Sequence, residues 1–336
     1  MNSWAPPKVA HIFIYFGLFY PWLLLFNIIF TIYWISDRSY FFIVPLLIIA
    51  LGWGHVKSIV GFNSKGNRTQ EGKEVNIVSH NLHYLKNFYE GDKIMEGEEL
   101  IKRMKNSKAD IFCFQEFPRF LKNPQELPIK ISKQTSFRYF KRFGKSDLYV
   151  FSKFPFKETG GKVFNNKVNG FQVLDIDLGD DQKLKVFNVH FASNQVSVIA
   201  DKIAKGPEME ESEKVKSFLG MLRHYRRSAI TRVEQGQEVL ELVRSSSIPV
   251  IVAGDFNEVP QSYIFNQFRK ELSDSFSEKG KGFGFSYNGR FPGLRIDYIF
   301  ASKELNLIES RVLPSDFSDH RQVMTVFEIK QYENLQ

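Results

Sequence analysis

Residues 248–257 read IPVIVAGDFN, an apolar run that ends in an acid and an amide. An apolar run of this length, rich in β-branched side chains, predicts a buried strand. Helical patterns lie between such runs, and the longest covers residues 222–243. Further strands are predicted at residues 75–79, 110–114, 149–152, 184–191, 296–301 and 323–329. This order predicts an α/β fold in which helices cover sheets.

Polar residues recur where the apolar runs end. A carboxylate at the end of a buried strand costs free energy of desolvation unless it binds a cation or hydrogen-bond donors. One such residue is usually a turn or cap residue, but a large set of acids, amides and imidazoles predicts one site for a hard divalent cation and an anionic phosphate. The set comprises Asn81, Glu116, His190, Asp255, Asn257, Asp297, Asp319 and His320.

The order of these residues, with GDFN at 254–257 and SDH at 318–320, resembles the endonuclease/exonuclease/phosphatase superfamily, which includes DNase I-like nucleases. The resemblance covers residues 75–329. It implies a four-layer α/β sandwich, in which two packed mixed β-sheets are flanked by helices. It also implies hydrolysis of phosphoesters that depends on a divalent metal, with Mg²⁺ as the cofactor and Mn²⁺ as a substitute.

The resemblance implies three residues on the metal side of the site. Glu116 resembles the principal Mg²⁺ carboxylate, and Asn81 resembles the amide that supports this metal and the scissile phosphate. Asp319 is similar to a second carboxylate on the metal side.

The resemblance also implies catalytic roles. Asp255 resembles the carboxylate that orients or deprotonates the attacking water, and Asn257 the donor to a non-bridging oxygen. His320 resembles the imidazole on the phosphate, with Asp297 on its other nitrogen. His190 resembles the imidazole that contacts the phosphate or assists the leaving group. These roles agree with phosphoryl transfer, which needs neutralised charge and an in-line water.

The stretch GKGFGFSYNGRFPGLR, residues 280–295, leads into Asp297. Loops beside a site commonly contact its ligand. Tyr287, Asn288 and Arg290 are therefore predicted to contact the substrate.

The N-terminal part of the chain has a different character. Residues 9–35 and 39–56 contain no Asp, Glu, Lys or Arg. Since a helix needs roughly 20 apolar residues to cross a bilayer, residues 1–61 are predicted to form a two-helix transmembrane hairpin with spans at about 9–35 and 39–58. Tyr33, Trp34 and Tyr40 flank the turn, where an aromatic belt would lie. A signal peptide fits less well, because the first run is long and a second follows at once. A buried core hairpin is the other alternative.

The predicted organisation is a hairpin, a linker at residues 62–73, a catalytic domain at 74–330 and a tail at 331–336. Two spans place both ends of the hairpin on one side, and Lys8, Lys57, Lys65, Arg68 and Lys73 lie there. The positive-inside rule then predicts an integral membrane protein whose catalytic domain is cytoplasmic. The expected partners are the bilayer, through residues 9–58, and a phosphoester; no obligate protein partner is evident.

Composition narrows the function. A single cysteine excludes a disulfide framework and a cysteine-based zinc site. A net charge of +8, mainly outside the hairpin, and an arginine cluster within 222–243 favour a nuclease-like enzyme. The hairpin favours the alternative, a sphingomyelinase-like phosphodiesterase that acts on a lipid headgroup. An inactive binding module is the weakest alternative, because every catalytic position is filled.

Two related classes are disfavoured by motifs. GDFN is not accompanied by the GNH motif of calcineurin-like phosphatases. SDHRQV, residues 318–323, lacks the Cys-Asp-Arg of the inositol phosphatases in the family that the chain resembles.

Overall fold

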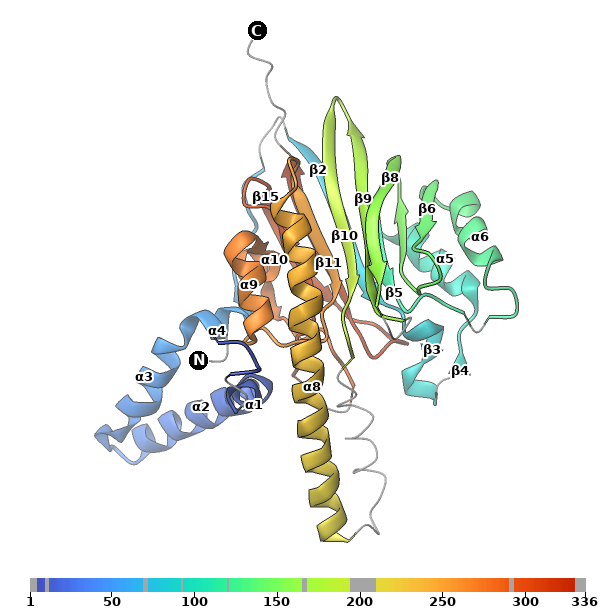
Figure 1. Cartoon of the computed structure of the whole chain (residues 1–336). Helices are drawn as coiled ribbons and strands as arrows, with labels where there is room; N and C mark the ends of the chain where they lie inside the picture. Colours follow the sequence, from blue (N-terminus) through green and yellow to red (C-terminus); the bar gives the residue numbers. More distant parts are fainter. Residues whose placement is uncertain are drawn as a thin grey trace.

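The structure is a computed structural model that describes residues 5–9, 12–68, 72–91, 93–119, 121–164, 168–193, 210–289 and 293–329. Two six-stranded sheets form the body, helices lie on their outer faces, and a helical hairpin projects from one end (Figure 1).

The first sheet has the strand order β12-β14-β11-β10-β9-β8. Its strands are β8 (Phe156–Val163), β9 (Gly170–Gly179), β10 (Gln182–His190), β11 (Val250–Asp255), β12 (Ser273–Asp274) and β14 (Asp297–Ala301). Within it β10 and β11 are parallel, and the other pairs are antiparallel. Parallel neighbours require a long crossover, and this one contains the long helix α8 (Glu211–Arg244).

The second sheet has the order β15-β16-β2-β5-β7-β6. Its strands are β2 (Lys73–Asn81), β5 (Ile111–Gln115), β6 (Tyr139–Arg142), β7 (Tyr149–Ser152), β15 (Asn306–Leu313) and β16 (Gln322–Ile329). Here β2 and β5 are the parallel pair. Both sheets are therefore mixed, as the sequence predicts.

Alternate residues of each strand face opposite sides, so each sheet has two apolar faces. Between the sheets, Ile77 and Cys113 pack in one cluster with Val186 and Ile251. The outer face of the first sheet is covered by α8 and by α9 (Tyr263–Glu271). The outer face of the second is covered by α5 (Gly97–Asn106) and α6 (Glu126–Gln134). The layers are thus helix, sheet, sheet, helix.

Smaller elements complete the body. They are the two-stranded sheets β1 (Val60–Phe62) with β13 (Lys281–Phe283) and β3 (Lys86–Asn87) with β4 (Lys93–Ile94), the short helix α10 (Ser275–Lys279), and the 3-10 turns η2 (His83–Leu85) and η3 (Phe88–Glu90).

The N-terminal segment is a helical hairpin, but its helices are shorter than predicted. They are α1 (Phe13–Leu18), α2 (Tyr20–Ser36), the 3-10 turn η1 (Tyr40–Phe42), α3 (Ile43–Leu51) and α4 (Trp53–Lys57). The first run is interrupted at Phe19, which is the N-cap of α2. Pro21 lies in the first turn of α2, a position that favours proline. The second is divided by the 3-10 turn and by Gly52.

The prediction of two continuous helices over 9–35 and 39–58 is therefore wrong. In the described part of the chain, no helix combines the length and the apolar character needed to cross a membrane. The expected bilayer partner and the cytoplasmic side remain predictions.

The first part of the predicted linker lies along the body. Asn63 donates from its backbone to Gly280 and from its side chain to Ser277, and Gly66 N–H donates to Ile308. Residues 69–71 and the predicted tail, 331–336, are outside the described residues.

Close packing between β10 and β11 leaves no room for a side chain at position 254. A Cβ atom on Gly254 would lie 1.9 Å from the carbonyl oxygen of Val189. We expect Gly254→Ala to lower the free energy of unfolding by about 3 kcal/mol or more, because the strands must separate or the backbone must distort. Urea denaturation measures this loss. Gly220→Ala, in open space on α8, is the control and should be neutral or slightly stabilising; an unchanged midpoint for Gly254→Ala would contradict the packing.

Candidate active site

Three predicted residues lie in one row across the first sheet. The β10–β11 register pairs His190 with Asp255, and the β11–β14 register pairs Asp255 with Asp297. All three are buried, with side chains at the sheet edge where β10 and β11 end. The sequence predicted that these strand ends meet, and the structure brings them together.

The second sheet supplies Asn81 from the end of β2 and Glu116 from just beyond β5. Asn81 Nδ2 donates to Asp255 Oδ2 at 3.1 Å and to Glu116 Oε1 at 3.3 Å. One amide therefore links a carboxylate of each sheet. Glu116 has a left-handed backbone, with φ of 48°, a conformation that costs a non-glycine residue about 1–2 kcal/mol and that is common at functional sites.

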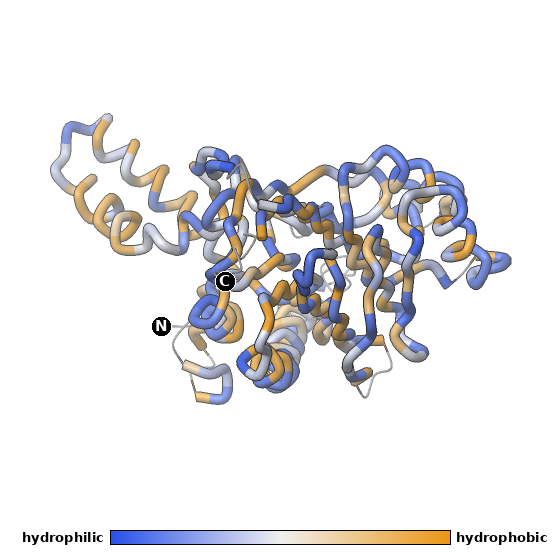
Figure 2. Tube along the Cα trace, turned by 90° about the horizontal axis from the view of Figure 1, so that it is seen from above, coloured by the Kyte–Doolittle hydropathy of each residue, from blue (hydrophilic) through white to orange (hydrophobic). Residues whose placement is uncertain are grey.

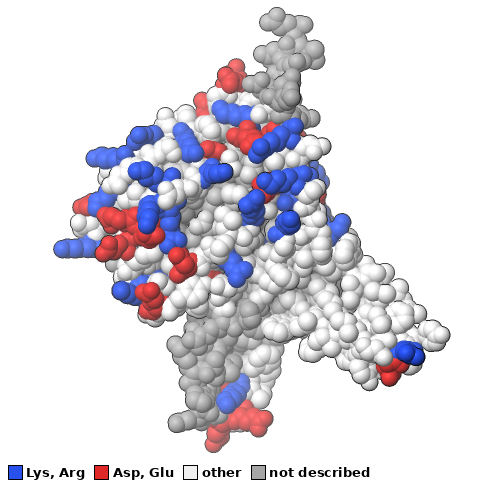
Figure 3. Space-filling model, turned by 180° about the vertical axis from the view of Figure 1, so that it is seen from behind, with Lys and Arg blue, Asp and Glu red and all other residues white. Residues whose placement is uncertain are grey.

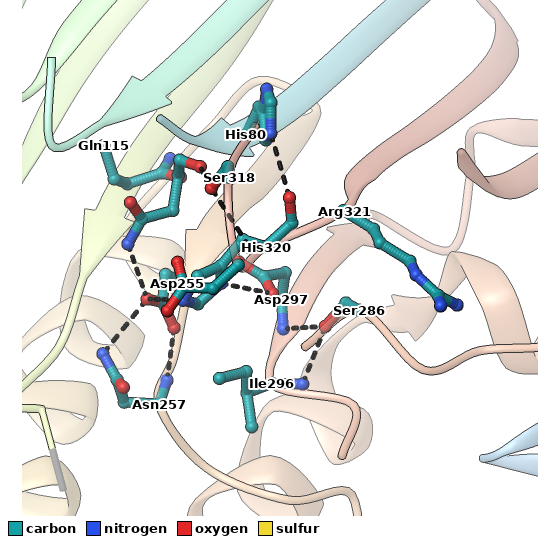
Figure 4. Close-up of polar contacts among 12 residues, drawn as sticks. His80, Gln115, Asp255, Asn257, Ser286, Ile296, Asp297, Ser318, His320 and Arg321 are labelled. Carbon is teal, nitrogen blue, oxygen red and sulfur yellow. Dashed lines mark hydrogen bonds and ion pairs between the residues drawn. The ribbon is translucent and has the colours of Figure 1, made fainter. Parts of the chain in front are cut away.

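His320 and Asp297 form a buried dyad (Figure 4). His320 Nδ1 lies 3.0 and 3.1 Å from the two carboxylate oxygens of Asp297. Burial alone would lower the pKa of His320, but the negative charges of Asp297 and Asp255 outweigh it and raise this pKa well above its usual value. The imidazolium therefore donates from Nδ1 to Asp297, and its Nε2 faces Asp255 Oδ2 at 3.8 Å.

Two residues that sequence reasoning did not assign to the site hold the turn that carries His320. Burial lowers the pKa of His80 to about 3, so its ring is neutral, and its Nε2–H donates to the His320 carbonyl at 3.1 Å. Ser318 Oγ accepts from His320 N–H and donates to the Asn81 carbonyl. The serine was visible in the SDH motif, whereas nothing local distinguishes His80 from a core histidine.

Asp255 and Asn257 form a tight turn after β11. Asp255 Oδ1 accepts from Asn257 N–H at 2.8 Å, and Asp255 Oδ2 accepts from Asn257 Nδ2 at 3.2 Å. Asn257 Nδ2 also donates to the Phe191 carbonyl at 3.1 Å. Burial raises the pKa of Asp255 to about 6, with the charge of Asp297 adding to it, while His320 and His190 act in the opposite direction. This carboxyl can therefore exchange a proton near neutral pH.

His190 is enclosed, with 2% of its surface exposed. Its Nε2 lies 3.7 Å from Asp255 Oδ2 and 3.8 Å from Glu116 Oε1. Burial lowers its pKa, so the ring is neutral at pH 7. Its buried Nδ1 has no hydrogen-bond partner among the described residues.

Glu116 and Asp319 form the most exposed end of the site. Burial raises the pKa of Glu116, and the negative charge of Asp319 raises it further. Asp319 Oδ1 is buried, accepts no hydrogen bond from the described residues and lies 3.3 Å from His83 Nδ1. Two carboxylates that repel each other, one with an oxygen that accepts no hydrogen bond from the described residues, fit a hard divalent cation.

A second group of possible ligands is compact. Asp255, Asp297 and His320 each offer one ligand atom, and these atoms lie within 4.8 Å of one another. Both Asp297 oxygens already engage His320 Nδ1. Asp297 therefore has no oxygen free of His320, whereas Asp319 Oδ1 accepts no hydrogen bond from the described residues.

Two of the three predicted substrate-binding residues lie beside the site. The Tyr287 ring packs edge-on against His320, with centroids 5.3 Å apart. Asn288 N–H donates to the Asp319 carbonyl, and Asn288 Oδ1 accepts from Arg321. Arg290 falls outside the described residues.

Sequence reasoning missed two buried polar pairs near the site. Gln115 Nε2 donates to Asn188 Oδ1 at 2.7 Å across the space between the sheets. Glu258, next to Asn257, binds Arg232 of α8 through two hydrogen bonds of 2.8 and 2.9 Å. Asn188 lies two residues before His190 and so shares its face of β10, which is the signal that could have revealed it.

The dyad predicts a measurable shift in the pKa of His320. In the metal-free protein, Asp297→Asn should lower this pKa because the imidazolium loses its partner's charge. Histidine-selective NMR over a pH series, with His320→Gln for assignment, measures it. Asp175→Asn, which removes a carboxylate elsewhere on the same sheet, should leave it unchanged. An equal pKa of His320 in the wild type and in Asp297→Asn would contradict the dyad.

Two family models match parts of the chain. Residues 79–320 match the Endonuclease/Exonuclease/phosphatase family, and residues 1–59 match a domain of unknown function, DUF8431. No curated protein sequence matches the chain.

Solved structures show the same fold. An endonuclease/exonuclease/phosphatase from Bacteroides vulgatus has a TM-score of 0.54 and 14% identity, covering 77% of this chain and 100% of its own. One from Beutenbergia cavernae has a TM-score of 0.53 and 17% identity, covering 77% and 72%. A family protein from Leptotrichia buccalis has a TM-score of 0.52 and 16% identity, covering 76% and 100%. The chain belongs to the endonuclease/exonuclease/phosphatase family.

Proposed function

We propose that the protein hydrolyses phosphodiesters or phosphomonoesters by in-line attack of water, with the help of a divalent cation. The observation that carries this proposal is the convergence of three units at one edge of the two sheets. These are the His320–Asp297 dyad, the Asp255–Asn257 turn and the Glu116–Asp319 pair. Together they offer a cationic donor, a base and a cation site to one phosphate.

Asp255 is the proposed group that orients the water and takes its proton. Its raised pKa and its central position, within 4 Å of both His190 and His320, suit proton exchange near neutral pH. Asn257 is the proposed donor to a non-bridging oxygen. Since Asn257 Nδ2 bonds to Asp255 and to Phe191 in this structure, substrate must replace one of these acceptors.

His320 is the proposed positive charge on the phosphate. Asp297 keeps it protonated and fixes the ring, so that Nε2 remains available. His190 is neutral and buried beside Asp255 and Glu116, which suits a contact to the phosphate or the leaving group. Charge fixed before substrate arrives needs no reorganisation during the reaction.

A divalent cation, Mg²⁺ or Mn²⁺ as its substitute, would be held by Glu116 and Asp319 with support from Asn81, and when bound it would neutralise negative charge on the phosphate. The fit rests on the repulsion between the two carboxylates and on the Asp319 oxygen that accepts no hydrogen bond from the described residues.

The sequence leaves two substrate classes open, a nucleic acid and a lipid headgroup. The nuclease-like prediction relied on the arginine cluster of α8, but Arg232 of that cluster is fully buried against Glu258 and cannot contact a nucleic acid. Arg223 and Arg227 are exposed. The preference for nucleic acid therefore remains a prediction, with a lipid headgroup as its alternative.

Removal of either central group should abolish hydrolysis. With Mg²⁺ or Mn²⁺, Asp255→Asn and His320→Ala should each lower the rate on bis(4-nitrophenyl) phosphate by at least about 100-fold. EDTA should have the same effect on wild type, reversed by added Mg²⁺.

The matched controls are Asp181→Asn, in the turn between β9 and β10, and His224→Ala on α8. Both should keep wild-type rates. Circular dichroism and thermal melting verify that each variant is folded. Full activity in folded Asp255→Asn, or in the presence of EDTA, would refute the proposed function.

A further inference from the structure

The hairpin formed by α2, η1 and α3, residues 20–51, is built largely of apolar residues (Figure 2), and many of their side chains are exposed. None of the residues of α2 is buried, and of α3 only Pro45 is. The large exposed ones are Trp22, Leu23, Leu25, Phe26, Ile28, Ile29, Phe30, Ile32, Tyr33, Ile35, Tyr40, Phe41, Ile43, Val44, Leu46, Leu47, Ile48 and Leu51. An apolar surface of this extent marks an interaction site.

Charge is confined to the turn of the hairpin. Between residues 12 and 56 the acidic and basic residues are Asp37 and Arg38, and they stand alone at the tip of an otherwise uncharged projection (Figure 3). The body, by contrast, carries many charged side chains. The boundary between charged and uncharged surface is therefore the base of the hairpin.

The polar side chains of α2 turn back onto its own backbone. Asn27 Nδ2 donates to the Leu23 carbonyl at 2.8 Å, Thr31 Oγ1 to Asn27 at 2.7 Å and Ser36 Oγ to Ile32 at 2.9 Å. On an exposed helix in water these groups gain little from such bonds, because water serves them equally well. In hydrocarbon the bonds are needed, since no other partner is present. The polar side chains of α2 are therefore compatible with a bilayer, because each donates to its own helix.

A bilayer fits the hairpin better than a protein groove. A groove covers one apolar stripe of a helix, whereas both helices here are apolar all round, as helices in a lipid environment are. Trp34 and Tyr40 near the turn and Trp53 at the base are side chains that favour the bilayer interface.

The hairpin is fixed to the active-site loop at both of its ends. On one side, Ile14 and Leu18 of α1 pack in a cluster with Tyr287 and Leu294. Tyr287 in turn contacts His320. The hairpin base therefore shares an apolar cluster with the tyrosine that packs against the proposed phosphate-binding imidazolium.

On the other side, the segment after α4 is bound by buried polar contacts. The Ser58 carbonyl accepts from Arg295 Nη1 at 2.8 Å, and Arg295 also pairs with buried Asp274. β1 then adds to β13, just before Tyr287. With both ends held, the hairpin sets the orientation of the site rather than acting as a loose tether.

A second apolar element projects from the same end of the body. The first turns of α8 extend beyond the sheets on the side where β10 and β11 end (Figure 1). There Val215, Phe218 and Leu219 are exposed at helical spacing, and exposed Arg223 and Arg227 follow toward the body. Apolar residues followed by arginines match an acyl layer beneath anionic headgroups.

We propose that the hairpin embeds in a lipid bilayer and holds the active site at its surface, and that the substrate is a phosphoester in the headgroup of a membrane lipid. The proposed lipid substrate rests on the proposed function, whereas the docking of the hairpin to a bilayer is independent of it. A nucleic acid substrate is the outcome that would overturn the substrate class.

Vesicle flotation tests the docking. Full-length protein in detergent is mixed with vesicles of equal parts phosphatidylcholine and phosphatidylglycerol, and the detergent is removed. Wild type should float with the vesicles. Ile28→Lys/Ile32→Lys, which changes exposed residues of α2, should lose at least about tenfold in partitioning. Ile129→Lys, an equally exposed position on α6 at the opposite side of the body, is the control and should float as wild type does. Equal flotation of the α2 variant would overturn the docking.

Hydrolysis tests the substrate class. Vesicles of equal parts phosphatidylcholine, sphingomyelin, phosphatidylglycerol and a phosphoinositide should release a water-soluble phosphate compound with wild type, and at least about tenfold less with the α2 variant. Bis(4-nitrophenyl) phosphate should be cleaved equally by both. If the protein cleaves this ester and plasmid DNA but releases no phosphate compound from vesicles, the proposed lipid substrate is overturned and the proposed hydrolysis is not. Loss of activity on every substrate would refute the proposed function instead.

Discussion

The pairing of β10, β11 and β14 places His190, Asp255 and Asp297 in one row across the sheet. A shift of one residue in this register would turn the middle side chain to the opposite face. Gly254 permits the pairing, because the Val189 carbonyl occupies the space that a side chain would need. The turn after β11, the amide of Asn81 and the ring of His320 all make their contacts to this row. The chemistry of the site is therefore a consequence of strand register.

Electrostatics decide what this row can do. Burial makes each isolated charge costly. The site contains one pair of charged groups that compensate each other and one pair that repel each other. Asp297 and His320 compensate each other within hydrogen-bond distance. Glu116 and Asp319 instead repel each other, and the pKa of Glu116 is raised by burial and by that repulsion. The uncompensated negative charge therefore lies at the most exposed end of the site, where a cation and a phosphate would enter together.

Much of this arrangement could be predicted from sequence. An apolar run predicts a buried strand, and the polar residue that follows the run marks the end of the strand. The predicted strand at 75–79 lies in β2, and those at 110–114 and 248–253 overlap β5 and β11. The site residues Asn81 and Asp255 are the last residues of β2 and β11. What could not be predicted depends on distant partners. Arg232 reads as part of a basic helix face but is buried by Glu258. His80 reads as a core histidine but holds the backbone of His320. The helix breaks at Phe19 and Gly52 are a different case, because they are local and lie next to Pro21 and at a glycine.

The central claim is that the two sheets together build one cation and phosphate site. Anomalous X-ray scattering from crystals containing Mn²⁺ tests it most directly, because the metal is located without reference to activity. The account predicts one strong peak bound by Glu116 and Asp319, with Asn81 adjacent and the His320–Asp297 hydrogen bond intact. A peak that separates His320 from Asp297, or Mn²⁺ bound only outside this cluster, would contradict it.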